Sequence, residues 1–377
     1  MSIVIGGDLV PTKENESFFY SGELNALFDE RLNRYFESVD YKIINLECPI
    51  TDRKEGIKKC GAHFSANEQL CRFFKTFQVD LLSLANNHIM DYGAEGLNDT
   101  IDALKDNGLA FVGAGKNEEE AARPFCFHHN GKKFCVISCA EHEFSIATAD
   151  SAGAYGYDEF KTNLLISRFK QQADYLIVLY HGGKEYYRYP SPALQKRCRA
   201  FVDSGADLVV CQHSHCIGAE EIYTSKRIVY GQGNFIFHYS NSECWKTGLL
   251  IEIDNELRVK YVPLIQTECG IGLANDEDAT QIMNDFRERS RKITEKGFLE
   301  KEFKSFSDSM IVDYLEVFSG NVSLVRRVLF KLFGAKYRDR FFRSRYSSKR
   351  VLQLRNYLNC ESHLELIRAG LENYDND

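Results

Sequence analysis

The chain of 377 residues is long enough to bury a sizeable core, and its apolar content of 44% is ordinary for a soluble globular protein. No apolar run approaches the ~20 residues that a membrane-spanning helix requires, so we expect no transmembrane anchor. The first predicted strand begins at Ser2 or Ile3, which leaves no room for a secretory signal. The 12 cysteines form no Cys-x-x-Cys pair, and we expect reduced thiols, such as Cys135, Cys139 and Cys211, in a cytosolic protein.

Predicted strands and helices alternate in the first third of the chain, which is typical of a parallel α/β sheet. The strands are short apolar runs that end in polar residues, and the helices have apolar residues at intervals of three or four. The predicted strands cover residues 2–8, 42–46, 81–85 and 111–115, and the predicted helices cover 23–39, 67–77 and 96–107.

The middle of the chain is richer in predicted strands. Asn130-Gly131 predicts a tight hairpin turn within residues 125–139, so the pattern changes there to antiparallel strands. The later predicted strands cover residues 175–180, 207–211, 219–223, 227–230, 248–253 and 257–264, with a helix over 192–204.

From Asp276 onward the sequence is charged, aromatic and helical in period, so we predict a boundary between Gln266 and Asp276. The expected organisation is an α/β domain over 1–270 and a helical extension over 276–377. Residues 326–355 contain eleven Lys or Arg and one acidic residue, a charge of +10, which leaves −17 on the remainder of the chain. A basic segment on an acidic body indicates an anionic partner.

Five predicted strand ends carry side chains of the types that bind metal ions. The glycines of Gly6-Gly7-Asp8 predict a sharp turn after the first strand, and Pro49 ends the second. The carboxyl ends of parallel strands meet in one crevice, where ligands usually bind. Carboxylates, amide carbonyls and neutral imidazoles suit Mn, Zn or Fe. The residues at these ends are Asp8, Glu47, Asn87 with His88, His181, and His213 with His215.

Each residue taken alone also fits a structural role, such as a buried core histidine for His181. His213 and His215 are the most informative pair, because at two-residue spacing in extended backbone both rings project to one side. With Cys211 or Cys216 they could instead form a small structural zinc site, although no second Cys pair lies close in sequence.

Seven motifs run in order along the chain: G-G-D, N-L-E-C-P-I-T, L-A-N-N-H-I-M-D-Y-G, V-G-A-G, L-Y-H-G-G-K-E-Y, Q-H-S-H and G-Q-G-N-F-I-F. In this order they resemble the CapA-type capsule and poly-γ-glutamate biosynthesis proteins, a branch of the calcineurin-like metallophosphoesterases. The resemblance runs from Ile3 to about Leu264 and does not include the helical extension. It implies a four-layer α/β/β/α sandwich with the metal site at the strand ends.

The resemblance also implies two divalent metal ions and a role for each residue. His88 would approach the substrate, orienting a phosphoryl oxygen or protonating the leaving group, and Glu47 would bridge the two ions as part of the catalytic machinery. Asp8 and His215 would complete one metal position, and Asn87, His181 and His213 the other.

Two departures from the family pattern affect this assignment. Val10 replaces the histidine of the usual Asp-x-His motif, so we expect a weaker or differently completed first metal position. Gln212 replaces a glycine before His-x-His and either crowds the site or adds a polar group. Candidate substrate contacts are Asn86, Lys184, Tyr186 and Asn234, whereas Glu141 and His142 fit a solvated loop better.

The expected function is a cytosolic, dinuclear metal-dependent hydrolase, with phosphoesters as substrates, in the synthesis or modification of a cell-surface polymer. Its partner would be that anionic polymer or its phosphorylated precursor. Amide or peptide chemistry on a poly-γ-glutamate-like polymer is the alternative. A non-catalytic assembly factor of a capsule synthase is a third hypothesis, against which the retained His88, His181, His213 and His215 argue.

The basic segment 326–355 interleaves its cations with aromatic and aliphatic residues. It is compatible with an amphipathic helix on an anionic membrane, which would place the protein at the inner membrane face. It is also compatible with a clamp for an anionic polymer, or with aromatics that pack on the main domain beneath solvated cations. Nucleic acid is the least favoured partner, because no nucleic-acid-binding motif accompanies the segment.

Overall fold

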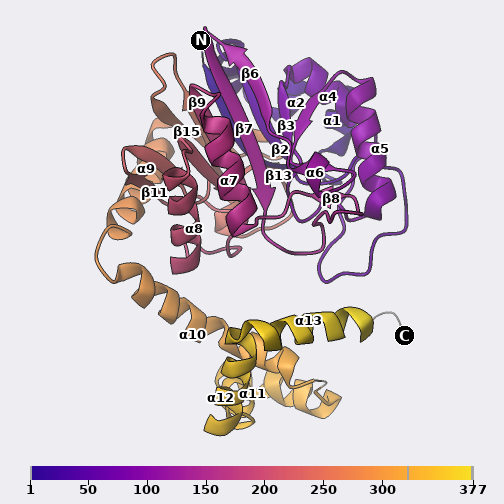
Figure 1. The fold of residues 1–377 in the computed structure, drawn as a ribbon, viewed down its shortest axis with the longest axis vertical. Coiled ribbons are helices and arrows are strands. Elements are labelled where there is room, and N and C mark those ends of the chain that lie inside the picture. The colour runs from indigo at the N-terminus through magenta and orange to yellow at the C-terminus, as the bar shows by residue number, and fades with distance from the viewer. Residues whose placement is uncertain (1, 321, 375–377) are drawn as a thin grey trace. The chain divides into compact units, whose positions relative to one another are not determined.

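The computed structural model describes residues 2–320 and 322–374 (Figure 1). The chain divides into a first unit that ends at Leu299 and a second unit that begins at Glu300. The division lies one helix later than the expected boundary, because helix α9 (Asp276–Lys292) packs on the first unit through Phe286 and its neighbours. Arg289 of this helix also donates to the carbonyl oxygen of Gly218 at 2.7 Å.

Two large sheets form the first unit. The first has eight strands in the order β16-β15-β14-β1-β2-β3-β4, with β13 paired to β1, and the second has six in the order β11-β12-β10-β9-β7-β6. The first sheet contains β1 (Ile3–Val10), β2 (Tyr41–Leu46), β3 (Leu81–Ser83), β4 (Ala110–Val112), β13 (Asn234–Phe237), β14 (Thr247–Ile253), β15 (Val259–Gln266) and β16 (Ile271–Leu273). The second contains β6 (Phe125–His129), β7 (Lys132–Ala140), β9 (Tyr175–His181), β10 (Leu208–Gln212), β11 (Glu220–Tyr223) and β12 (Lys226–Val229), and β5 (Ala114–Gly115) pairs separately with β8 (Gly153–Ala154).

Alternating side chains of the strands build three apolar layers. Ile5 and Ile43 of the first sheet share one cluster with Ile177 and Val210 of the second, so the two sheets pack face to face. The outer face of the first sheet packs on helices such as α4, and the outer face of the second packs on helices such as α8. The expected four-layer α/β/β/α sandwich is therefore confirmed.

The remaining helices of the first unit connect these strands (Figure 1). They are α1 (Glu16–Ser21), α2 (Leu24–Leu27), α3 (Glu30–Glu37), α4 (Leu70–Phe77), α5 (Gly93–Asp106), α6 (Glu118–Ala121), α7 (Glu159–Lys170), α8 (Pro192–Asp203) and the 3₁₀ helix η1 (Glu243–Lys246). The single helix expected over 23–39 is two helices, because Asp29 is extended and caps α3 by accepting from the backbone N–H of Leu32 at 2.7 Å.

The first strand corrects the expected turn at Gly6-Gly7-Asp8. β1 continues through these residues to Val10, with shifts of register on either side of Asp8. A Cβ atom on Gly7 would overlap the carbonyl oxygen of Gly233. The glycine therefore permits a close approach of two backbones instead of a turn.

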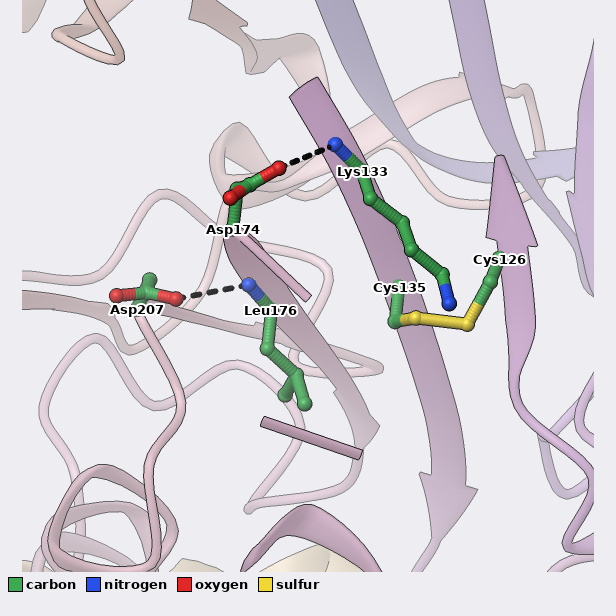
Figure 2. The surroundings of a disulfide bond; sticks show 6 residues. All are labelled: Cys126, Lys133, Cys135, Asp174, Leu176 and Asp207. Carbon is green, nitrogen blue, oxygen red and sulfur yellow. Dashed lines mark hydrogen bonds between the residues drawn. A yellow bond between two sulfur atoms is a disulfide. The ribbon is translucent and has the colours of Figure 1, made fainter. Parts of the chain in front are cut away.

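One expectation about the cysteines is wrong. Cys126 and Cys135 form a disulfide between β6 and β7, where they are direct antiparallel partners across the confirmed Asn130-Gly131 hairpin (Figure 2). In the same sheet, the side chain of Asp174, directly before β9, accepts from the backbone N–H of Lys133 in β7 at 2.7 Å. Disulfides persist mainly in oxidising compartments, so the cysteines no longer support the expected cytosolic location.

All secondary-structure elements in the described part of the second unit are helices. Its helices are α10 (Phe298–Phe318, which begins in the first unit), α11 (Leu324–Ser344), α12 (Ser348–Asn359) and α13 (Glu361–Tyr374). Val312, Val322 and Phe342 form its small core. Within the described ranges, no helix has both the length and the apolar character needed to cross a membrane.

Candidate metal centre

Two buried carboxylates lie at neighbouring strands of the first sheet. Asp8 is 1% exposed within β1, and Glu47, fully buried, directly follows β2. Asp8 accepts from the side chain of Asn45 at 2.7 Å and from the backbone N–H of His213 at 3.1 Å. Neither carboxylate oxygen of Glu47 has a hydrogen-bond partner in the described part of the chain.

Three buried imidazoles from the second sheet face these carboxylates. His181 ends β9, and its Nε2 lies 3.3 Å from Oε1 of Glu47 and 3.0 Å from Oδ1 of Asn87. Nδ1 of His215 lies 3.6 Å from Oδ2 of Asp8. The ring centroid of His213 lies 4.9 Å from that of His181. Residues far apart in sequence are thus brought together where the two sheets face each other.

The backbone at His213 and His215 differs from the extended backbone expected from the sequence. Their φ angles are 86° and 54°, in the left-handed region that residues other than glycine rarely adopt. The bonds from His213 to Asp8 and between His215 and Asn234 hold this conformation. Strain of this kind is kept where the surrounding structure fixes it, often at functional sites.

The potential ligand atoms form two groups that share one residue. Asp8, Glu47 and His215 make one group, and Glu47, His181 and His213 make the other, with the atoms of each within 4.8 Å of one another. Glu47 belongs to both, which is the position that a bridging carboxylate occupies. Oδ1 of Asn87 lies next to the second group, because it is 3.0 Å from Nε2 of His181.

Burial shifts the pKa values of the site toward neutral side chains. Burial raises the pKa of Asp8 to about 7, with a further contribution from Glu47, and burial raises the pKa of Glu47 to about 8. Burial also lowers the pKa of His181 and His213, and it lowers the pKa of His215 to about 3. The imidazoles are therefore neutral, as metal ligands must be, and a bound cation would stabilise the ionised carboxylates.

Unpartnered atoms support a fit between this donor set and metal ions. Both oxygens of Glu47 and Nδ1 of His213 are buried without hydrogen-bond partners in the described structure. Buried polar atoms of this kind require a partner, such as an ion or an ordered water. Oxygen and imidazole donors in two groups suit two divalent ions.

Gln212 and Asn234 address the two departures from the family pattern. The amide of Gln212 donates to the carbonyl oxygen of Gly6 at 3.3 Å, so the side chain ties β10 to β1. Asn234 pairs with Asp8 in register, and its Oδ1 lies 2.9 Å from Nδ1 of His215. The amide oxygen of Asn234 therefore lies beside His215 of the first group, the group to which Val10 contributes no ligand.

His88 belongs to neither group. Its Nδ1 lies 2.8 Å from Oδ2 of Asp91 and 3.1 Å from Nζ of Lys59, and its ring packs edge-on against Phe64. Lys59 and Asp91 form a buried ion pair. Neither partner was predicted from the sequence, although Asp91 is only three residues after His88 in the same motif.

A cavity of about 370 Å³ lies beside the centre, lined by His88, Lys59, Tyr186 and His215 among others. Of the four predicted substrate contacts, only Tyr186 lines it. Asn86 is buried and donates to the carbonyl oxygen of Leu46 at 2.8 Å, which corrects its expected role to one of holding the turn. The exposed Lys184 and the buried Asn234 are not among the lining residues.

Glu141 is closer to the centre than a solvated loop would place it. Its Oε1 lies 3.7 Å from Nε2 of His213, and Oε2 accepts from the backbone N–H of Gly183 at 3.2 Å. With Glu143 and His213 it forms a third group of potential ligand atoms. The sequence could have indicated this position, because Glu141 directly follows β7, the parallel neighbour of the strand that ends at His181.

Comparison with known proteins finds one family and several relatives to which the chain is similar. The model of the bacterial capsule synthesis protein PGA_cap matches residues 2–239. The chain is 33% identical over 212 residues to the capsule biosynthesis protein CapA of Bacillus anthracis, covering 54% of this chain and 52% of the relative. It is 30% identical over 207 residues to the PGA biosynthesis protein CapA of Bacillus subtilis, covering 54% of each. The chain thus spans about half the length of these curated relatives.

Solved structures give lower similarity. A phosphatase of Mycoplasma pneumoniae matches with 14% identity and a TM-score of 0.43, covering 70% of this chain and 94% of that one. A putative 5'-nucleotidase of Staphylococcus aureus also matches with 14% identity and a TM-score of 0.43, covering 76% of this chain and 58% of that one. The PGA_cap model, in contrast, matches more than half of the sequence and all the strand-end residues described above. The chain therefore belongs to the bacterial capsule synthesis protein family PGA_cap.

Proposed function

We propose that this chain is a metal-dependent hydrolase that cleaves phosphoric esters in the synthesis or modification of a capsular or poly-glutamate polymer. The observation that carries the proposal is Glu47, a fully buried carboxylate without a hydrogen-bond partner that belongs to two adjacent groups of potential ligands. A buried carboxylate in this position is costly unless a cation neutralises it.

The residues divide between two ions in this proposal. Asp8 and His215 would hold one, Asn87, His181 and His213 would hold the other, and Glu47 would contact both. Divalent ions there would supply Lewis-acid activation of the ester and of water. The amide oxygen of Asn234 would complete the first position, where Val10 provides no ligand.

His88 would act on the substrate from the cavity side. Asp91 engages its Nδ1 at 2.8 Å, which fixes the ring and leaves Nε2 as the nitrogen available to the substrate. In the imidazolium form, in which Nδ1–H donates to Asp91, Nε2–H would orient a phosphoryl oxygen or give its proton to the leaving oxygen. Lys59, which pairs with Asp91, would keep that carboxylate in place.

The polymer assignment rests on the relatives' names and is the less direct part of the proposal. CapA of Bacillus subtilis is named for PGA biosynthesis, and a relative of Mycobacterium tuberculosis, 26% identical over 248 residues, is named a probable polyglutamine synthesis accessory protein. These names favour amide chemistry on the polymer as the second candidate, since the same donor groups can activate an amide carbonyl.

The test combines metal content with turnover. Protein purified without chelators should contain close to two divalent ions per chain and should hydrolyse an aryl phosphomonoester or phosphodiester after Mn²⁺ addition. Glu47→Ala and His215→Ala should lower the metal content, whereas His88→Ala should keep the metal and abolish turnover. His128→Ala removes an exposed histidine elsewhere and should change neither.

The possible outcomes separate the candidates. Loss of metal in His88→Ala would contradict the role given to that residue. Two ions without phosphoester hydrolysis, but with cleavage of a γ-glutamyl amide, would replace the phosphoesterase proposal by amide chemistry. Absence of both metal and turnover would favour a non-catalytic assembly factor.

A further inference from the structure

Exposed apolar side chains are concentrated in the second unit. Among the described residues, six strongly exposed large apolar side chains precede Glu300 and seventeen follow it. The first part of α11, residues 324–333, contains five of these seventeen, among them Leu324 at 79% and Leu332 at 71% exposed. A concentration of this kind marks a surface that binds something.

Four exposed apolar residues of this segment share one side of the helix. Leu324, Val328 and Leu332 are spaced by four residues, and Val325 widens the same side. We call these four residues the α11 apolar face. Gly334, with φ 75° and ψ −176°, ends the straight segment at a kink.

A different side of the segment holds it to its own unit. Phe330 packs on the small core formed by Val312, Val322 and Phe342. The α11 apolar face does not belong to the core of the second unit, because that core is made by Val312 of α10, by Val322 and by other residues of α11.

Cations adjoin the α11 apolar face. Arg327 and Lys331 follow Leu324 by three and seven residues, so they lie next to the face on the helix surface, and both are exposed. No carboxylate of the described chain lies within ion-pair distance of either, whereas Arg338 further along pairs with Asp313 and Glu316. The cations beside the face are thus available to an external anion.

We propose that the α11 apolar face and its adjoining cations dock the protein on a membrane surface that contains anionic lipids. A bilayer interface accepts apolar side chains and attracts cations at the same time. A soluble polyanion would contact only the cations. A second copy of the chain would bring Arg327 and Lys331 of both copies together, which like charges disfavour.

The test measures binding of the full chain to vesicles by co-sedimentation. One set of vesicles mixes phosphatidylglycerol with phosphatidylcholine, and the other contains phosphatidylcholine alone. The apolar variant is Val328→Gln with Leu332→Gln, and the charge variant is Arg327→Gln with Lys331→Gln. Matched controls on the first unit are Phe160→Gln with Leu164→Gln, and Lys75→Gln with Lys196→Gln, all of them exposed positions.

The expected result is preferential binding to the anionic vesicles. Each cation near such a surface strengthens binding about fivefold, so the charge variant should bind about 25-fold more weakly. The apolar variant should weaken binding at least tenfold, and both controls should bind like the unchanged chain.

Three results would overturn the proposal. The first is equal binding to both kinds of vesicle, or none. The second is full binding by the apolar variant together with tight, charge-dependent binding to soluble polyglutamate, which would identify a polyanion clamp. The third is a dimer in light scattering that only the apolar variant dissociates, which would identify a second copy as the occupant. The substituted side chains are exposed, so unchanged thermal unfolding separates lost binding from misfolding.

Discussion

Binding of Mn²⁺ to the metal-free protein should release protons from two buried carboxyl groups. Burial raises the pKa of Asp8 to about 7 and that of Glu47 to about 8, so both groups hold a proton in mildly acidic solution. Burial lowers the pKa of His181, His213 and His215, which favours their neutral forms, so the imidazoles should contribute less than the carboxyl groups to the protons released.

The affinity for Mn²⁺ should fall as the pH falls, because protons and the metal compete for the same oxygens. With one group titrating near pH 7 and the other near pH 8, the apparent Kd should be about a thousandfold higher at pH 6 than at pH 9. About two protons should leave at pH 6 when the centre fills, and almost none at pH 9.

Isothermal titration calorimetry in buffers of different ionisation enthalpy counts these protons at each pH. Glu47→Gln removes the group that titrates at the higher pH, so this variant should bind Mn²⁺ more weakly and release one proton fewer per filled centre at pH 6. His128→Ala, at an exposed position outside the centre, should leave the count unchanged. A Kd that does not vary from pH 6 to pH 9 would refute the reasoning, since the carboxyl groups would then be ionised before the metal binds.

Three further substitutions test the remaining structure. Asp91→Asn should lower kcat about a hundredfold or more without changing metal content, because the amide no longer fixes the ring of His88; equal kcat would contradict the orienting role. Gly7→Ala should destabilise the chain by about 3 kcal/mol in urea unfolding, because its Cβ would overlap the backbone of Gly233; an unchanged midpoint would show that the strands can separate. Cys126→Ser should cost about 2.5 kcal/mol under oxidising conditions and nothing in reducing buffer, where a difference would indicate a packing effect instead.

The sequence could predict the fold and the ligand types because both follow from local patterns. Short apolar strands that end in carboxylates, amides or imidazoles predict parallel strands whose carboxyl ends meet. β1 and β2 are parallel, as are β7 and β9, so Glu47 and His181 lie at strand ends, but on two sheets that face each other. The Asn130-Gly131 hairpin was predictable for the same reason, since two residues set its turn.

Contacts between distant segments could not be predicted in the same way. Gly7 lacks a side chain where the backbone of Gly233, more than two hundred residues later, comes close to it. The local sequence pattern indicated a turn instead. The partner of Cys126 depends on strand register, which spacing alone does not fix. Lys59 comes from a loop without periodicity, so nothing in its neighbourhood connected it with His88.

The geometry of His213 and His215 shows why the ligand types were easier to predict than their supports. A strand would have sent both rings to one side, yet both residues adopt left-handed backbone and still face the carboxylates. Asp8 holds the backbone of His213, and Asn234 holds the ring of His215, both from strands of the opposite sheet. The chemistry therefore depends on residue types that a short motif contains, while their placement depends on the packing of two sheets. A substitution such as Asn234→Ala should disturb the centre even though the motif that carries its histidines is left intact.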